Sequence, residues 1–154
     1  MRFQKSIFLL ISWIFILLLM GYLLGLLTQA SIPNWYVFLN KSPFTPPNFL
    51  FGIAWTILYI CIAVSGWLIW QKELTVIKPL FISQLILNWV WTPLFFTYHL
   101  TGVAFFCIGF ICVLLAYLLY RAYFLFKPVF WLLLPYFLWL LFASHLNFYV
   151  WQYN

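Results

Sequence analysis

Residues 42–59 read SPFTPPNFLFGIAWTILY, a proline-rich approach that leads into a long apolar stretch without a charged residue. Pro is well tolerated at the first position of an α-helix, where its missing N–H group costs nothing. The pattern predicts a helix over residues 49–70, with Thr45 as its cap and Pro46 and Pro47 at its first positions. This helix has the length and apolarity needed to cross a lipid bilayer.

Four similar runs accompany it, and together they predict an all-α integral membrane protein, a single five-helix bundle over residues 1–154. Of the 154 residues, 68% are hydrophobic, 25% are aromatic and only 5% are charged. A soluble domain of this size needs far more charge. The predicted spans are 7–28, 49–70, 79–97, 101–120 and 128–151. The first is too long for the apolar core of a signal peptide, and its GYLLG segment (Gly21 and Gly25) suits close contact between helices.

The basic residues predict the orientation of the chain. With five spans, six of the seven Lys and Arg residues lie on one side of the membrane and only Lys41 lies on the other. Because cytoplasmic loops carry the excess of Lys and Arg, we expect a cytoplasmic N-terminus and a C-terminus outside. The net charge of +6 is spread over separate loops, so nothing indicates nucleic-acid binding, whereas a bilayer with anionic lipid suits it.

Acidic chemistry is nearly absent from the sequence. There is no Asp, and Glu73 is the only Glu, which excludes catalysis by paired carboxylates and a carboxylate metal site. His99 and His145 are open to two interpretations, as haem ligands or as helix-to-helix hydrogen-bonding groups. No metal site and no disulfide is predicted, because the cysteines lie inside spans and suit the role of small hydrophobes: Cys61, Cys107 and Cys112.

Aromatic and amide side chains recur at helical spacing and predict a ligand cavity inside the bundle. Unsatisfied amides are costly in lipid, so the face of the third span that carries Gln84 and Asn88 must point inward. These faces predict a cavity that suits a large, flat, apolar ligand, with the stiff segment 29–48 as its lid. They comprise Phe51, Trp55 and Tyr59 in the second span, Gln84, Asn88, Trp91 and Phe95 in the third, and Pro135, Trp139, Phe142, Ala143, Leu146 and Asn147 in the fifth.

Three segments carry a resemblance to a known family. NWYVFLNKSPFTPPNFLFGIAWTILY, QLILNWVWTPLFF and PYFLWLLFASHLNFYVWQYN resemble the signature regions of the TspO/MBR family of tryptophan-rich sensory proteins and translocator proteins, the homologues of the peripheral benzodiazepine receptor. The resemblance covers residues 33–154. It implies a five-helix bundle, usually a homodimer, that binds porphyrins such as protoporphyrin IX and haem, synthetic benzodiazepine-type ligands and, in mitochondria, cholesterol.

The resemblance also implies site residues and alternative activities. Tyr36, Trp55, Asn88, Trp91, Trp139 and Ala143 match family positions that line the pocket, and the faces above add Tyr59 and Phe142. The expected function is a membrane receptor or sensor for porphyrins, with no intrinsic cofactor. The alternatives are a light-dependent catalyst of porphyrin degradation, in which Trp55 and Trp139 take part, and a porphyrin or lipid transporter.

Two positions depart from the family pattern. Gln152 stands where the sterol-recognition pattern that includes Leu146 and Tyr149 needs a basic residue, so sterol binding through it is not expected. Ile53 replaces a Pro that is common after the Phe-Gly pair, so a kink is not expected there.

Overall fold

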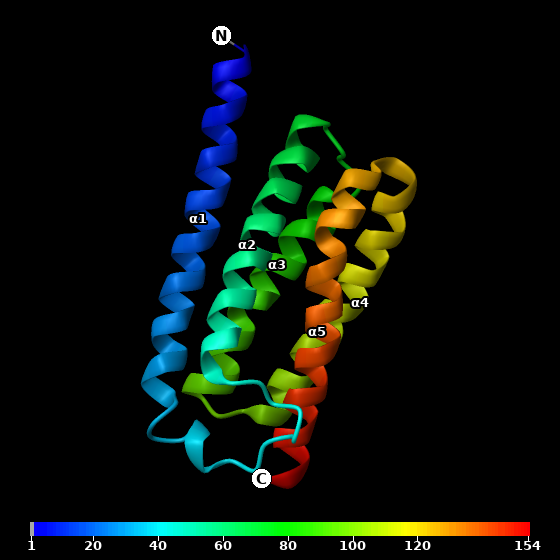
Figure 1. Ribbon diagram of the computed structural model, residues 1–154. Coiled ribbons are helices and arrows are strands. Elements are labelled where there is room, and N and C mark those ends of the chain that lie inside the picture. Colours follow the sequence, from blue (N-terminus) through cyan, green and yellow to red (C-terminus); the bar gives the residue numbers. More distant parts are fainter. Residues whose placement is uncertain (1) are drawn as a thin grey trace.

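The computed structural model describes residues 2–154, and the side chains of residues 6–154, as five long helices that run side by side (Figure 1). The helices are α1 (Arg2–Ser31), α2 (Asn48–Gln71), α3 (Lys78–Thr92), α4 (Thr101–Leu125) and α5 (Lys127–Tyr153), with the short turns η1 (Tyr36–Phe38) and η2 (Pro93–Thr97). Within the described residues, five helices are long and apolar enough to cross a membrane, α3 doing so together with η2. The predicted fold class is therefore confirmed.

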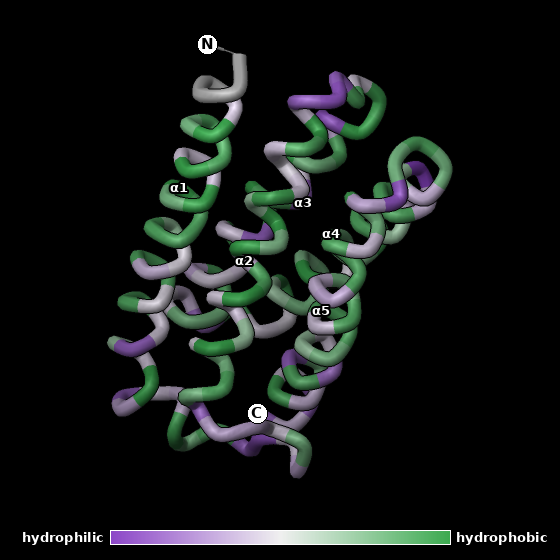
Figure 2. Tube along the Cα trace, turned by 45° about the horizontal axis from the view of Figure 1, so that its top comes forward, coloured by the Kyte–Doolittle hydropathy of each residue, from purple (hydrophilic) through white to green (hydrophobic). Residues whose placement is uncertain are grey.

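The helices form a closed ring in the order α1, α2, α5, α4, α3. The N- and C-termini lie at opposite ends of the bundle, as an odd number of spans requires (Figure 1). Hydrophilic segments gather toward the ends of the helices, and the stretches between them are mostly hydrophobic (Figure 2). Many large hydrophobic side chains of these stretches are exposed on the outside of the bundle. α1 stands at the edge, and Leu17 is the only one of its described side chains that is fully buried. The protein is a multi-pass integral membrane protein.

The core fills the half of the bundle near the N-terminus of α1. There Phe81, Leu118, Leu133 and Tyr136 are completely inaccessible to solvent. They are contributed by α3, α4 and α5, whose aliphatic and aromatic side chains interlock with those of α2. Because this half is solidly packed, any guest must bind in the other half, near the long segment 32–47.

The start of α2 differs from the prediction. The helix begins at Asn48 after the cap residue Pro47, and no side chain caps it. Thr45 instead donates its backbone N–H to the carbonyl of Ser42 at 2.9 Å, which closes a turn before the two prolines. Pro47 is extended, with ψ at 143°, and so lies outside the helix as its cap residue. Pro46, which precedes Pro47, is disfavoured in the helical conformation. The predicted capping role of Thr45 and the predicted place of Pro46 and Pro47 at the first positions of the helix are therefore wrong.

The other boundaries lie close to the prediction, with three differences. α1 begins at Arg2, five residues before its predicted start. α4 continues to Leu125, well past residue 120, so that only Phe126 separates it from α5. The third span changes its winding at Pro93, where the N–H of Tyr98 reaches back five residues to the carbonyl of Pro93 at 2.9 Å. A turn closed by such a five-residue hydrogen bond is a π-helical turn, called the wide turn below. π-helical turns mostly occur singly within α-helices and often lie at functional sites.

Candidate functional site

A cavity of about 460 Å³ lies between the helices in the half of the bundle that the segment 32–47 closes. All five helices, η1 and η2 contribute to its wall. Its size falls within the range of about 300–1,000 Å³ that is typical of small-molecule sites. Because the surroundings of the bundle are apolar, a solute that occupies this cavity is shielded from water on most sides.

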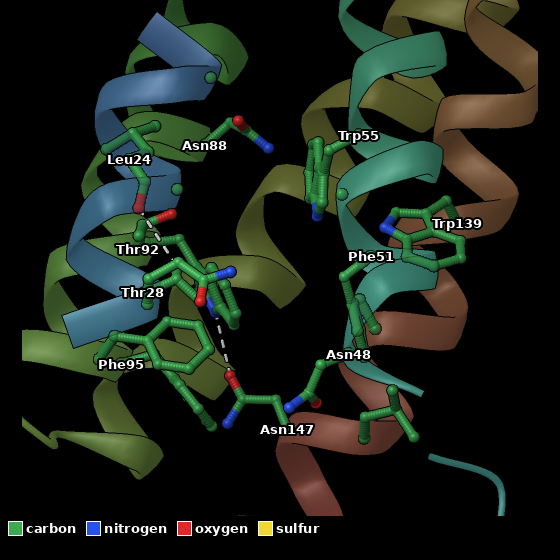
Figure 3. A pocket seen from close by; sticks show the side chains of 18 of the residues that line it. Leu24, Thr28, Asn48, Phe51, Trp55, Asn88, Thr92, Phe95, Trp139 and Asn147 are labelled. Atoms are coloured by element: carbon green, nitrogen blue, oxygen red, sulfur yellow. Dashed lines mark hydrogen bonds between the residues drawn. The ribbon is translucent and has the colours of Figure 1, made fainter. Parts of the chain in front are cut away.

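Aromatic rings form two facing walls of the cavity (Figure 3). On one side, Phe51 of α2 meets Trp139 of α5 edge to face, with ring centroids 5.8 Å apart, and Trp55 lies one turn further along α2. On the other side, Trp91 and Phe95 stack at 5.2 Å with an angle of 18° between their planes. Flat π-systems stack well on such surfaces, so the walls suit a planar guest.

Few polar groups line the cavity, and most of them are hydrogen-bonded to other groups of the protein. The hydroxyl of Tyr59 donates to Oδ1 of Asn88 at 3.1 Å, and Nε1 of Trp91 donates to Oδ1 of Asn147 at 3.0 Å. Asn147 in turn donates through Nδ2 to the carbonyl of Thr101 at 2.8 Å. These bonds tie α2 to α3 and α3 to α5, as expected where polar groups in lipid must find partners inside the protein.

One cavity residue keeps an unused donor. The indole Nε1 of Trp139 is buried and has no hydrogen-bond partner among the described residues. Because this atom has almost no accessible surface, protein atoms enclose it and it is not exposed to the cavity. Trp139 therefore contributes its ring, rather than its N–H group, to the wall of the cavity.

The segment 32–47 lies across the end of the cavity and is fastened at several points. Nζ of Lys41 donates hydrogen bonds to the backbone carbonyls of Tyr36, Val37 and Leu39 at 3.0–3.1 Å. These bonds hold the turn η1 in shape. Ser42 and His145 form a hydrogen bond at 3.2 Å between Oγ and Nε2. Within this segment Ile32, Tyr36 and Thr45 line the cavity. Burial of the phenol raises the pKa of Tyr36.

The wide turn η2 places its side chains against this segment. Phe95 is buried between Trp91 and Tyr36, whose ring lies 6.4 Å from its own. The change of winding turns the carbonyl of Phe96 toward α1, where it accepts a hydrogen bond from the hydroxyl of Ser31. The last four carbonyls of a helix have no partner within it, so this bond satisfies one of them and links α1 to the third span.

Comparison with known proteins places this architecture in a family. Residues 12–152 match the model of the TspO/MBR family. The chain belongs to the TspO/MBR family. It is 36% identical to the tryptophan-rich protein TspO of Archaeoglobus fulgidus over 151 residues, which cover 94% of this chain and 96% of that protein. It is 36% identical to the translocator protein of Ovis aries over 127 residues (79% and 75%), and 31% identical to that of Homo sapiens over 127 residues (79% and 75%).

Most residues that the TspO/MBR resemblance and the helical spacing single out lie together at the cavity. Its lining includes Tyr36, Trp55, Tyr59, Asn88, Trp91, Trp139 and Ala143. Phe142 is not among the lining residues, and its ring packs against that of Trp139 with centroids 5.7 Å apart. It supports the wall from behind, because it lies about 100° around the helix from its neighbour Ala143, which faces the cavity.

The cavity also has lining residues that the sequence did not indicate. α1 contributes Leu18, Gly21 and Thr28, and α4 contributes Ile108 and Ile111. The aromatic residues of α4 that recur at helical spacing, among them Phe106, Phe110 and Tyr117, are exposed on the outer surface, so this pattern does not mark the side that points inward. The apolar sequence of α1 gives no sign of its inward side either. The patterns that could be recognised were the amides of the third span and the tryptophans of the second and fifth spans.

The two histidines of this TspO/MBR chain lie outside the cavity lining. The imidazole of His99 stacks on the indole of Trp35 at 4.0 Å, and His145 is engaged with Ser42. Among the described residues there is no cluster of three His, Cys, Asp or Glu side chains that could hold a metal ion. A porphyrin in this cavity would therefore be recognised through its ring and its polar substituents.

Proposed function

We propose that the protein is a membrane receptor or sensor that binds porphyrins, protoporphyrin IX or haem, in the aromatic cavity. The observation that carries the proposal is the pair of facing walls, Phe51, Trp55 and Trp139 against Trp91 and Phe95. Membership of the TspO/MBR family supports it. In this view the rings of the cavity stack on the faces of the macrocycle, and the protein supplies orientation rather than covalent chemistry.

The polar groups of the cavity are proposed to contact substituents on the rim of such a ring. Asn88 and Asn147 lie on different helices, and each has its oxygen engaged by a neighbouring donor. Their fixed positions limit the reorganisation that binding requires, and preorganisation of this kind favours affinity.

The segment 29–48 is proposed to act as the lid of the site. Pro43, Pro46 and Pro47 restrict its backbone, so little conformational entropy remains to be lost when a ligand binds beneath it. Tyr36 and Thr45 give it direct contact with the cavity. Closure over the site is then expected to slow release of the ligand rather than to create the binding surface.

A fluorescence titration tests porphyrin binding. Purified protein in lipid nanodiscs is titrated with protoporphyrin IX while the emission of tryptophan is followed. We expect saturable quenching that is strongly reduced in the Trp55→Phe, Trp139→Phe double variant. Trp131→Phe is the matched control, because Trp131 is 61% exposed on the outer surface of α5 and lies outside the cavity lining. Absence of saturation, or equal quenching in all three proteins, contradicts the proposal.

A light-dependent degradation of porphyrin is a second candidate, and one observation favours it. Trp55 and Trp139 come from different helices but line the same cavity, so a bound ring would contact both indoles. Such a reaction would use dioxygen as its oxidant. Under illumination in air, porphyrin absorbance is expected to fall faster with this protein than with the double variant. Equal rates would eliminate this activity while leaving binding intact.

The homodimer and the orientation in the bilayer also belong to the proposal. The family resemblance supports a homodimer, and counting protomers by stepwise photobleaching in nanodiscs tests it. Lys72, Lys78, Arg121 and Lys127 lie at helix ends opposite to Lys41. Since Lys and Arg accumulate on the cytoplasmic side, the N-terminus is proposed to be cytoplasmic and the C-terminus to lie outside.

A further inference from the structure

α1 and α2 are tightly packed along only part of their length. The indole of Trp67 donates to the carbonyl of Ser6 at 3.1 Å, and the ring of Trp13 lies 5.2 Å from that of Trp70. The last close contact is at Gly21, where an added Cβ would lie 2.7 Å from two ring carbons of Tyr59. The two antiparallel helices therefore touch from the beginning of α1 to the level of Gly21.

Beyond this level the two helices separate. A Cβ added to Gly25 of α1 or to Gly52 of α2 would meet no heavy atom within 4 Å. In an antiparallel pair that is in register at Gly21 and Tyr59, Gly25 comes to the level of Trp55 and Gly52 to that of Thr28. Helices that remained in contact would place side chains against both glycines. The open space at both positions, together with their place in the cavity lining, indicates that the gap lies between the helices.

This gap joins the cavity to the outer surface of the bundle. Gly25 and Gly52 both line the cavity. So do Tyr22 of α1, which is 65% exposed, and the exposed residue Thr56 of α2. A residue that lines a cavity and is also exposed on the outer surface marks an opening. In Figure 3 the labelled residues of α1 and of α2 face one another across the open space.

The neighbouring seams of the cavity are closed by side chains. Phe51 and Trp139 meet between α2 and α5, and Ser31 binds the carbonyl of Phe96 between α1 and η2. At the loop end, the amide of Asn154 and the backbone of Asn40 form reciprocal hydrogen bonds at 2.8 and 3.1 Å. None of these contacts bridges the gap between α1 and α2.

The opening faces the bilayer. Gly25 lies about 9 Å along the helix axis from Ser31, the last residue of α1, since each helical residue rises 1.5 Å. The flanking hydroxyl of Thr56 is satisfied within α2, because it donates to the carbonyl of Gly52 at 2.8 Å. The rim of the gap is thus compatible with acyl chains, which tolerate no unsatisfied polar group.

We propose, building on the porphyrin binding proposed above, that the ligand passes directly between the bilayer and the cavity through the gap between α1 and α2. Gly25 and Gly52 form the two sides of this lateral portal. A flat apolar ring accumulates in the membrane, so this route spares it passage through the fastened loop. The absence of side chains at the two glycines sets the width of the portal, and larger residues there obstruct the passage.

Stopped-flow quenching of tryptophan fluorescence by protoporphyrin IX tests the portal in nanodiscs. Gly25→Leu and Gly52→Leu are expected to slow both association and dissociation by about tenfold, the effect of ~1.4 kcal/mol on a barrier. Gly109→Leu is the matched control, because Gly109 of α4 also has nothing within 4 Å and lies outside the cavity lining. Its rates are expected to equal those of the unmodified protein.

Different failures of this experiment are distinguishable. Unchanged rates in both glycine variants, with normal equilibrium quenching, overturn the portal and leave porphyrin binding standing. A change confined to dissociation shows that the glycines only line the bound ligand, and this also overturns the portal. Absence of quenching in the unmodified protein overturns the proposed function, and the portal with it.

A second measurement separates the bilayer route from an aqueous one. Porphyrin is loaded into vesicles that contain the protein, and the amount of lipid is raised at constant total porphyrin. If the porphyrin enters laterally, the association rate is expected to follow the ratio of porphyrin to lipid in the membrane. The variant Asn154→Ala, which removes the reciprocal hydrogen bonds to the backbone of Asn40, is expected to leave this rate unchanged. A rate that follows aqueous porphyrin, and that rises in Asn154→Ala, overturns the lateral route.

Discussion

The phenol of Tyr59 on α2 donates a 3.1 Å hydrogen bond to the side-chain oxygen of Asn88 on α3. Both side chains are nearly inaccessible to solvent, at 4% and 5% exposure, yet both line the cavity. The bond crosses the bundle between two helices that share few other contacts. It therefore links the stability of the bundle to the shape of the site.

The first prediction concerns the energy of this bond. Tyr59→Phe and Asn88→Leu are each expected to lower stability. The first leaves the amide of Asn88 without its donor, and the second leaves the hydroxyl of Tyr59 without its acceptor, in an apolar interior. In a double-mutant cycle, the coupling is expected to be about 0.6–1.7 kcal/mol, the range found for hydrogen bonds between membrane helices. Reversible unfolding in one detergent measures all four proteins. Effects that simply add would show that the two groups do not interact.

The second prediction compares two glycines. An alanine Cβ at Gly21 would come within 2.7 Å of the buried ring of Tyr59, so Gly21→Ala is expected to destabilise the protein by about 1–3 kcal/mol. Gly109→Ala has open space and is expected to be neutral or stabilising by up to about 1 kcal/mol. Thermal unfolding of both variants provides the measurement. Equal stability of the two variants would mean that the ring of Tyr59 moves aside without a loss of folding free energy.

The sequence was sufficient to predict the number and approximate ends of the helices. Hydrophobic length determines a membrane span almost by itself, because no other regular structure of that length satisfies its backbone in lipid. The amide pair at Gln84 and Asn88 identified the inward face of the third span, and both residues are buried. Trp55, Trp91 and Trp139 likewise line the cavity as their spacing predicted.

The details of the loops could not be obtained in this way. Thr45 has the right chemistry for a cap, but the turn with Ser42 engages its backbone before the helix begins. Gly21 and Gly25 form one sequence pattern, yet only Gly21 contacts the neighbouring helix. The divergence of α1 from α2 depends on contacts made elsewhere along both helices, and local sequence does not contain that information.

The third prediction concerns pH. Burial raises the pKa of Tyr36 above its ordinary value of 10.0, because the charged phenolate is poorly solvated there. Its contribution to stability is therefore fully present below about pH 10 and is lost as the pH rises through the pKa of the folded state. The difference in phenolate absorbance between the unmodified protein and Tyr36→Phe is expected to titrate above pH 10.0. A midpoint at or below that value contradicts the burial of the phenol.

The fourth prediction concerns orientation. Phe44 and Thr75 are exposed residues at opposite ends of the bundle. Phe44→Cys is expected to react in intact cells with a membrane-impermeant maleimide, and Thr75→Cys only after lysis. The three native cysteines lie inside the spans and serve as the background in the unmodified protein. The reverse pattern of labelling would contradict a cytoplasmic N-terminus.

The last prediction concerns the fastening of the loop to the end of α5. Asn154 accepts from the backbone N–H of Asn40 and donates to its carbonyl, and Asn40 also donates to the carbonyl of Tyr153 at 3.1 Å. Asn154→Ala removes both of its side-chain bonds to Asn40, each worth about 0.5–1.5 kcal/mol, together with its bond to the carbonyl of Val150. Amide hydrogen exchange in residues 32–47 is therefore expected to accelerate about tenfold, while the core of α4 stays protected.

Ser144→Ala is the control for this measurement, because its hydroxyl binds the carbonyl of Leu141 within α5 and does not touch the loop. Exchange in residues 32–47 is expected to be unchanged in that variant. If Asn154→Ala accelerated exchange throughout the bundle, the amide pair would support the whole fold. If it accelerated none, other side-chain hydrogen bonds of the segment would hold the loop without it, among them that of Asn40 to the carbonyl of Tyr153 and those of Lys41 and Ser42.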